Sequence, residues 1–337
     1  MSLEERIDRL AEMGQQMLKD PHMEEITHKA YAANPWFTIE NVKKSIEVIC
    51  TEYLNRAKLQ EWTRQYNIHT TPQSKAIGLV MAGNIPAVGF HDLLSVWICG
   101  YKALIKFSTK DQNIMSWITG WMNRLDTRED NYITEVELLT NFDAVIATGG
   151  DNTSRYFEYY FRHVPHIIRK NRNGIAILHG SENYDDLYLL GHDVFSYFGL
   201  GCRNVSRLWA PESFEVDALL EPWNNFDHVM DHTKYKNNYD YNLALFLLNK
   251  EKFIQHPNIL LKEDDQIASR IACINISRYQ SLQEVMDDIN HNADKIQCII
   301  SAQSMGGVSV ISPGQSQNPS LWDYADGVDT MQFLTTL

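Results

Sequence analysis

Short apolar runs alternate with turns and helix-like stretches from Lys75 onward, and this alternation limits the chain to a few folds. Four runs come first, at 76–82, 103–107, 143–147 and 175–179. Four more follow, at 206–210, 271–276, 297–301 and 307–312. Strands that alternate with helices are typical of crossover units, which build parallel sheets covered by helices. The pattern therefore predicts an α/β protein with two lobes.

The first 70 residues have the apolar spacing of helices instead. Val42, Ile46 and Ile49 recur at helical intervals behind Thr38, a suitable N-cap residue. We therefore expect a helical segment ahead of the first sheet.

The order of these regions suggests a division of the chain. We assign 1–172 to the N-terminal helices and the first lobe, 173–312 to the second lobe, and 313–337 to a C-terminal arm. Residues 221–249 are rich in Asn, Asp, His and aromatic side chains, and we expect loops or an insertion there.

Composition excludes several classes of protein. The chain has 337 residues and a net charge of −13, which argues against nucleic acid as the main partner, because phosphate backbones select for Lys and Arg clusters. No apolar run is long enough to span a membrane, and the charged N-terminus does not resemble a signal peptide. The cysteines are odd in number and scattered, without a CxxC pair or an HExxH helix, so we expect neither disulfides nor a metal site. A cytoplasmic location fits best.

The strongest local signal is the loop Phe-Gly-Leu-Gly-Cys-Arg-Asn at 198–204. Cys202 follows a glycine and precedes Arg203, and a nearby cation lowers a thiol pKa so that more of the nucleophilic thiolate is present. A buried structural cysteine is the usual alternative, and it is the better interpretation for Cys50, Cys99, Cys273 and Cys298, which lie in apolar or helical settings. We therefore predict that Cys202 is a reactive nucleophile.

Two further segments follow predicted strands. Asn84 lies in the turn Ala-Gly-Asn-Ile-Pro after the first strand, where its amide could donate to an oxyanion, although a plain turn would look the same. Thr148, Gly149 and Gly150 end another strand and begin a helix, where small residues let backbone amides approach a phosphate. No GxGxxG fingerprint is present.

The fourth segment is Ile-Lys-Phe-Ser-Thr-Lys at 105–110, again at the end of a strand. It contains Lys106, Ser108, Thr109 and Lys110, and its two lysines are placed to meet an anion. A solvated lysine is the simpler interpretation of either one alone.

The order of the four segments carries more information than each one alone. An asparagine turn, a Lys-x-Ser strand end, a Thr-Gly-Gly helix start and a Gly-x-Gly-Cys loop resemble the aldehyde dehydrogenase superfamily, whose members have an asparagine turn, Lys-Pro-Ser, Thr-Gly-Ser and Gly-Gln-x-Cys. Residues 77–208, with Asp-Tyr-Ala-Asp-Gly-Val-Asp at 323–329, resemble its acyl-CoA reductase branch, which includes the fatty-acid reductase of bacterial luminescence. The resemblance covers most of the chain after residue 70. It implies two Rossmann-like α/β lobes behind the helical N-terminal segment.

The resemblance also implies roles for single residues. Cys202 would form an acyl-enzyme, while Asn84 and the backbone amide of Cys202 would hold the oxyanion. Lys106 would contact the adenosine ribose, and Gly149 with Gly150 would face the diphosphate. Ser108, Thr109 and Thr148 would belong to the same cofactor-binding site. Asp265 would take the place of the glutamate that holds the nicotinamide ribose.

Two departures from the superfamily pattern shape the hypothesis. The glutamate that activates water in aldehyde-oxidising members would fall on Leu178, so hydrolysis of the acyl-enzyme should be slow and reduction favoured. His179 and Glu182 lie nearby as candidate proton donors, or as ordinary surface residues. Thr109 and Lys110 replace the acidic residue that binds the adenosine ribose, which favours NADPH over NADH.

The sequence therefore predicts an NADPH-dependent oxidoreductase that takes an acyl group from acyl-CoA or an acyl carrier protein and releases an aldehyde. We expect a homo-oligomer. The alternatives are a cysteine acyltransferase or thioesterase that needs no nicotinamide, and a non-catalytic binding module that keeps the fold.

Overall fold

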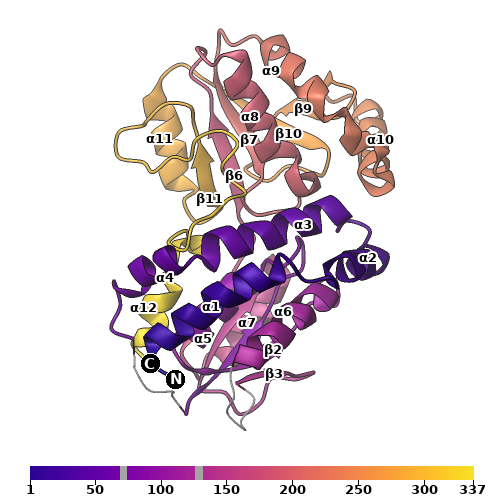
Figure 1. The fold of residues 1–337 in the computed structure, drawn as a ribbon. Helices are drawn as coiled ribbons and strands as arrows, with labels where there is room; N and C mark the ends of the chain where they lie inside the picture. Colours follow the sequence, from indigo (N-terminus) through magenta and orange to yellow (C-terminus); the bar gives the residue numbers. More distant parts are fainter. Residues whose placement is uncertain (69–73, 126–131) are drawn as a thin grey trace. The chain divides into compact units, whose positions relative to one another are not determined.

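The computed structural model describes residues 1–68, 74–125 and 132–337 (Figure 1). Contacts divide the chain into two compact units. The first unit contains Met1–Asn171 and Pro319–Leu337, and the second contains Arg172–Asn318. Each unit is built on its own sheet, so the prediction of an α/β protein with two lobes is confirmed.

Helices form the start of the first unit, as predicted. They are α1 (Leu3–Met17), α2 (Met23–Ala33), α3 (Ile39–Val48), a π-helical turn (Ile49–Tyr53) and α4 (Arg56–Thr63). Ser2 and Glu5 form a capping box that satisfies backbone N–H groups where α1 begins. The apolar face of α1 is fully buried, which ties the helices to the core of the unit.

The first sheet is parallel throughout. Its strands are β1 (Ala76–Val80), β2 (Lys102–Lys106), β3 (Ile133–Glu135), β4 (Ala144–Thr148) and β5 (His166–Arg169), in the order β3-β2-β1-β4-β5. Helices α5 (Phe90–Ile98), α6 (Gln112–Leu125) and α7 (Asp151–Phe161) connect strands of this sheet. The chain moves outward from β1 to β3 and returns to the other side of β1 with β4, so the strand order reverses between β1 and β4.

The last residues of the chain complete the core of this first unit. A short 3-10 turn, η4 (Ala325–Gly327), leads into α12 (Thr330–Thr335). Met331 and Leu334 are fully buried, and the hydroxyl of Tyr101 donates to the carbonyl of Leu334 at 2.9 Å. The segment at 319–337 therefore packs within the first unit, whereas 313–318 belongs to the second.

The second unit has a mixed sheet with the order β11-β6-β7-β10-β9-β8. The strands are β6 (Asn173–Ile177), β7 (Val205–Pro211), β8 (Ile254–Gln255), β9 (Leu260–Glu263), β10 (Cys273–Tyr279) and β11 (Ile296–Ile300), and only the edge strand β8 is antiparallel to its neighbour. The main helices are α8 (Tyr184–Phe195), α9 (Val216–Trp223), α10 (Thr233–Leu248) and α11 (Leu282–His291).

Two expectations about this second unit are wrong. Residues 307–312 form isolated bridges at Val308 and Ile311 and no regular strand, and Gly307 adopts a positive φ of 83° that interrupts extended pairing. Residues 221–249 are mostly helical: the 3-10 segment η3 (Asn224–Asp231) and α10 fill them. Within the described residues, no helix has the length and apolar character needed to cross a membrane.

Candidate functional site

In the first unit, the predicted segments meet at the carboxyl edge of the parallel sheet. The Asn84 turn follows β1, Lys106 ends β2, and Thr148 ends β4. Because β1 lies between β2 and β4, these three chain ends are neighbours. The strand order reverses beside β1, and open α/β sheets bind their ligands at the carboxyl ends of the strands where the order reverses.

The asparagine turn and the Lys-x-Ser segment are in close contact. Parallel pairing aligns Val80 with Lys106, which places Gly83 against Ser108. A Cβ at Gly83 would lie only 2.4 Å from the Ser108 Oγ, so no other residue fits at that point without moving Ser108. The Asn84 side chain that follows is exposed.

A buried acid, Asp111, supports this turn, and it was not identified from the sequence. Its Oδ2 accepts a hydrogen bond from the Ala87 N–H at 2.9 Å, and Ala87 adopts a positive φ of 54°. Its Oδ1 has no hydrogen-bond partner among the described residues. Burial raises the pKa of the Asp111 carboxyl well above its usual value, which favours the neutral acid. The sequence does contain a signal for this residue, because an acid lies two residues after Thr109.

The residues around Asp111 face outward. Lys106, Thr109 and Lys110 are exposed, whereas Asp111 is 2% exposed. The end of β2 therefore presents hydroxyl and ammonium groups and no exposed carboxylate over 106–111. Such a surface has no exposed negative charge at this position that would repel a phosphate group.

The Thr-Gly-Gly segment leads directly into α7. Gly150 is the N-cap of this helix, and its carbonyl accepts the Ser154 N–H at 2.9 Å. A Cβ at Gly149 would lie 2.9 Å from the Phe157 ring, so glycine is required there, whereas the nearest atom to a Cβ at Gly150 would be 3.8 Å away. A side chain at Gly150 would therefore meet no close neighbour among the described residues, and helix N-termini commonly bind anions through their first N–H groups.

In the second unit, Cys202 lies in the loop that enters β7. All five cysteines are described, and Cys202 alone is partly exposed while the others are buried. Burial raises the pKa of Cys50, Cys99 and Cys273 to about 12, so those thiols stay protonated. The prediction that the other four cysteines are core residues is confirmed.

The buried side chain of Asn204 fixes this loop on both sides of Cys202. Its Oδ1 accepts the Gly201 N–H at 2.8 Å, and its Nδ2 donates to the carbonyls of Asp193 and Ser196, each at 2.9 Å. The Arg203 Nε donates to the Ser316 carbonyl at 2.8 Å, which anchors the next residue. The loop sequence 198–204 includes Asn204, but sequence reasoning gave it no role.

The backbone that leads into the loop is strained. Tyr197 and Phe198 adopt positive φ values of 51° and 58°, a conformation that costs about 1–2 kcal/mol per residue for side chains other than glycine. The Phe198 ring lies 4.3 Å from the His232 ring, which supports it from η3 and α10. Strain that the surroundings hold in place is common at functional sites.

The structure contradicts the comparison that placed the superfamily's glutamate at Leu178. The carbonyls of Arg203 and Asn204 lie against Gly174, at the amino end of β6, whereas Leu178 follows the carboxyl end of that strand. Four residues of strand span about 13 Å. Leu178 is also buried, and its carbonyl accepts the Tyr279 hydroxyl at 2.7 Å. A glutamate at this position would not reach the Cys202 thiol, so Leu178 says nothing about hydrolysis.

His179 and Glu182 lie at the same far edge. The Glu182 carboxylate accepts the N–H groups of His179 and Gly180, and the His179 Nε2 lies 3.0 Å from the Ser301 hydroxyl. These contacts stabilise the turn after β6, which agrees with the simpler of the two interpretations given above.

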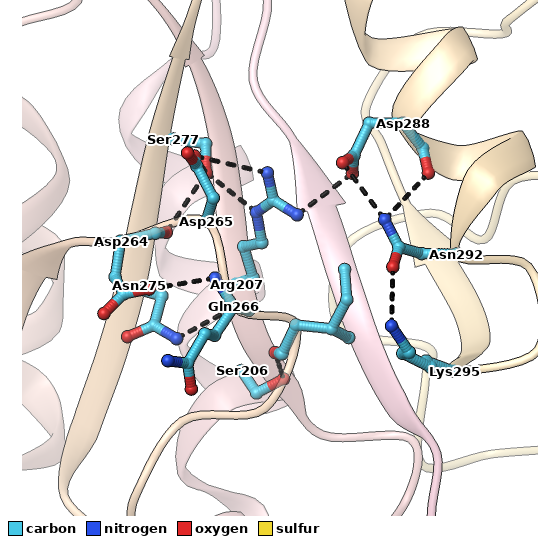
Figure 2. A network of polar contacts seen from close by, with 11 residues as sticks. Ser206, Arg207, Asp264, Asp265, Gln266, Asn275, Ser277, Asp288, Asn292 and Lys295 are labelled. Carbon is cyan, nitrogen blue, oxygen red and sulfur yellow. Dashed lines mark hydrogen bonds and ion pairs between the residues drawn. The ribbon is translucent and has the colours of Figure 1, made fainter.

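Asp265 lies in the loop between β9 and β10, and Figure 2 shows its surroundings. Its side chain is 90% exposed, yet its Oδ1 accepts the Ser277 hydroxyl at 2.9 Å and lies 3.6 Å from the Arg207 guanidinium. The Arg207 side chain is almost fully buried in β7. Sequence reasoning assigned no role to Arg207 or Ser277, although a charged residue within an apolar strand was a usable signal.

The sequence matches no protein-family model and no curated protein, but its fold matches solved structures. A putative aldehyde dehydrogenase from Burkholderia cenocepacia superposes with a TM-score of 0.68 at 12% identity, covering 91% of this chain and 76% of that one. Succinic semialdehyde dehydrogenase from Streptococcus pyogenes, solved with NADP⁺, gives 0.67 at 13% identity over 90% and 77%. NADP-dependent glyceraldehyde-3-phosphate dehydrogenase from Bacillus halodurans gives 0.61 at 14% identity over 89% and 74%. The chain therefore has the aldehyde dehydrogenase fold.

Proposed function

We propose that this protein is a nicotinamide-dependent reductase that converts an acyl thioester to an aldehyde through an acyl group carried on Cys202. The observation that carries the proposal is the Cys202 loop: one partly exposed thiol, held by Asn204 and preceded by strained backbone, in a chain with the aldehyde dehydrogenase fold. A purely structural cysteine would need none of these features.

The chemistry begins on the Cys202 Sγ. The thiolate attacks the carbonyl carbon of the acyl thioester, the bond from that carbon to the donor's sulfur breaks, and the donor thiol leaves with a proton. Coenzyme A or an acyl carrier protein would be that donor. The acyl group is now a thioester on Cys202. Addition of a hydride to its carbonyl carbon, followed by cleavage of the bond from that carbon to Sγ, would release the aldehyde and restore the thiolate. NADPH, when bound, would supply the hydride for this reduction.

Two groups would stabilise the negative charge on the acyl oxygen. The resemblance assigns this role to the side-chain amide of Asn84 and the backbone N–H of Cys202. Preorganised donors of this kind typically contribute a factor of about 100 to 1,000 each in turnover. Gly83 and Asp111 would keep the Asn84 turn in shape through their contacts with Ser108 and Ala87.

The carboxyl edge of the first sheet fits a nicotinamide cofactor with a 2′-phosphate. Lys106 and Ser108 would contact the adenosine ribose. Thr109 and Lys110 would accept the phosphate, because the only acid over 106–111 is buried and its pKa is raised. Thr148 and the space left open at Gly150 would receive the diphosphate. We therefore propose NADPH as the cofactor in place of NADH.

The direction of the reaction follows from the resemblance to acyl-CoA reductases. An enzyme that oxidises aldehydes would share the thiol and the cofactor, so both directions belong in the assay. NADPH and NADH consumption should be measured with acyl-CoA of several chain lengths, beside NADP⁺ reduction with the matching aldehydes. Thioester-dependent NADPH oxidation is the expected result. Thioester turnover without nicotinamide would instead indicate an acyltransferase or thioesterase.

Replacement of Cys202 tests the nucleophile directly. Cys202→Ala should abolish both acylation, detected by mass spectrometry of the intact chain, and NADPH oxidation. Cys298→Ala is the matched control, because the buried Cys298 thiol lies 3.7 Å from the Arg203 carbonyl beside the same loop. This control should keep acylation and activity. If Cys202→Ala still reduces the thioester, the proposed function is wrong.

Labelling of the wild-type protein with iodoacetamide is a second test. If the reagent labels several thiols equally, a binding module becomes the better explanation.

A further inference from the structure

A pocket of about 480 Å³ lies beside α6 in the first unit. Its walls come from two parts of the chain, the end of α1 with the turn that follows it (16–22) and the later turns of α6 (117–124). Helices α1 and α2 both pack against α6 (Figure 1). None of the lining residues belongs to the segments assigned to the cofactor, and pockets of about 300–1,000 Å³ commonly hold small ligands. We call this site the tryptophan pocket.

Trp117 and Trp121 form one wall of the tryptophan pocket. They lie four residues apart on α6, so their rings share one face of the helix. Both indole N–H groups donate to the same oxygen, the Asp20 Oδ2, at 3.1 and 3.0 Å. One carboxylate therefore sets the orientation of both rings, although both tryptophans are only half-buried. This arrangement keeps aromatic surface fixed and partly accessible instead of burying it in the core.

The Asp20 carboxylate has no acceptor position left for a ligand. Its Oδ1 accepts the His22 N–H at 2.9 Å and lies 3.0 Å from the His22 Nδ1, which donates because an ionised carboxylate can only accept. Such a group offers about four acceptor positions, and here all four have a donor. Burial alone would raise the pKa of Asp20, but the hydrogen bonds from His22 and the two indoles outweigh burial and lower it. Asp20 therefore orients the aromatic wall and has no free position for a cationic ligand.

Two cations line the same pocket. Lys19 and Arg124 are exposed, and among the described residues neither forms an ion pair. The Arg124 guanidinium lies 3.9 Å from the centre of the Trp121 ring, and its Nε donates to the Gly120 carbonyl at 3.2 Å. These contacts orient the guanidinium and leave its two Nη groups available. Because the charge of Asp20 is already bound by four donors, the two cations favour a negatively charged ligand.

We propose that the tryptophan pocket binds a small aromatic anion, with the ring of the ligand against the indoles and its acidic group between Lys19 and Arg124. Aromatic rings pack on indoles in stacked or edge-to-face arrangements, and a guanidinium that is already oriented suits the two oxygens of a carboxylate or sulfonate. The inference is independent of the proposed function, because every residue that carries it lies within Met1–Asn171 and outside the segments assigned to the cofactor.

The test uses the full chain and naphthalenesulfonate as the probe, measured by isothermal titration calorimetry with and without NADPH. One probe molecule should bind per chain under both conditions, because NADPH would occupy other residues. Naphthylmethylammonium and inorganic sulfate should each bind at least about tenfold more weakly, because the first is repelled by two cations and the second has no ring. This comparison separates the tryptophan pocket from a general anion site.

Three variants locate the bound probe. Trp121→Leu should raise its Kd roughly tenfold, because the substitution removes an aromatic surface. Lys19→Gln and Arg124→Gln should each raise the Kd about two- to fivefold, as expected for ion pairs at a protein surface. Lys43→Gln and Arg64→Gln are the matched controls, since each removes an exposed cation elsewhere in the same unit and should leave the Kd unchanged.

Four results would overturn the inference. They are the absence of saturable binding, displacement of the probe by NADPH, equal affinity for the cationic analogue, and an unchanged Kd in all three pocket variants. If Trp121→Leu does not fold, which its melting curve would show, Lys19→Gln and Arg124→Gln decide the question, because they alter only exposed side chains. Thioester reduction is measured separately, so failure of the proposed function leaves this result unaffected.

Discussion

Asp111 and Arg207 are both buried ionisable residues, and they differ in the charges around them. Burial lowers the pKa of the Arg207 guanidinium, while Asp288 and Asp265 oppose that shift and favour the charged form. Among the described residues, the Asp111 side chain has one backbone N–H as its partner, and burial raises its pKa. The acid beneath the Asn84 turn is therefore shifted toward its neutral form, whereas the buried cation of Arg207 is paired with a carboxylate.

Asp111→Asn should make the protein more stable at neutral pH. The folded-state pKa of Asp111 is raised, so its stabilising contribution is complete below the unfolded-state pKa of about 3.9 and is lost as the pH rises through the folded-state pKa. Within that window the wild type should lose about 1.4 kcal/mol per pH unit relative to the variant. The measurement is urea unfolding at pH 4.5, 6 and 7.5. A difference that does not grow with pH would contradict the neutral-acid interpretation.

At the scale of elements, the Cys202 loop depends on one amide side chain more than on its glycines. Asn204 connects the end of α8, the strained turn at 196–199 and the loop itself. The Gly-x-Gly-Cys pattern suggested a tight turn, but it did not show what holds the turn. The holding groups are carbonyls of Asp193 and Ser196, which only the packing of α8 brings into reach.

Asn204→Ala should cost roughly 3 kcal/mol of unfolding free energy, because it leaves several buried backbone groups without partners. It should also lower turnover roughly tenfold or more through misplacement of the thiol. Asn183→Ala is the matched control: it removes the capping box of α8 and should cost only about 1 kcal/mol, with turnover unchanged. Equal effects of the two substitutions on turnover would argue against the role given to Asn204.

Helix α10 shows why residues 221–249 were not predicted from the sequence. Its apolar residues do not follow a single face, since Leu247 and Leu248 are 62% and 80% exposed. Its buried positions include Tyr235, Tyr239 and Asn242, and all three donate to backbone carbonyls through their polar groups. The acceptors are the carbonyls of Asn258, His256 and Ile271, respectively. A helix buried partly through polar groups has no simple apolar period for the sequence to reveal.

At the scale of the whole molecule, the two units differ in whether a single chain segment builds them. The second unit is one unbroken segment, whereas the first needs Pro319–Leu337 from the end of the chain. Arg169 bonds to Asp92 at 2.7 Å and to the Thr330 hydroxyl at 2.8 Å, so β5, α5 and α12 share one buried cation. The Tyr324 hydroxyl lies 2.7 Å from the Trp62 Nε1 and connects the same segment to α4.

Truncation after Asn318 should therefore unfold the first unit and leave the second folded. The loss of Met331 and Leu334 removes fully buried side chains, each worth about 2–5 kcal/mol, and leaves Arg169 without Thr330. Calorimetry should show a lost transition, and hydrogen exchange should show loss of protection over 1–171 only. Removal of the last two residues is the control and should preserve both transitions. Unchanged protection over 1–171 would contradict the assignment of this segment.

The sequence by itself determined the α/β class, the helical N-terminus, the two sheets and Cys202 as the exceptional cysteine. These features depend on local apolar periodicity and on the positions of glycine and cysteine. Both can be read from the sequence without knowledge of tertiary contacts. Only the tertiary structure decided that Leu178 lies at the far edge of the sheet from the Cys202 loop, that Asp111 is a buried acid with a raised pKa, and that Arg207 and Ser277 contact Asp265. Strand register and burial determine these relations, and they join residues that lie far apart in the sequence.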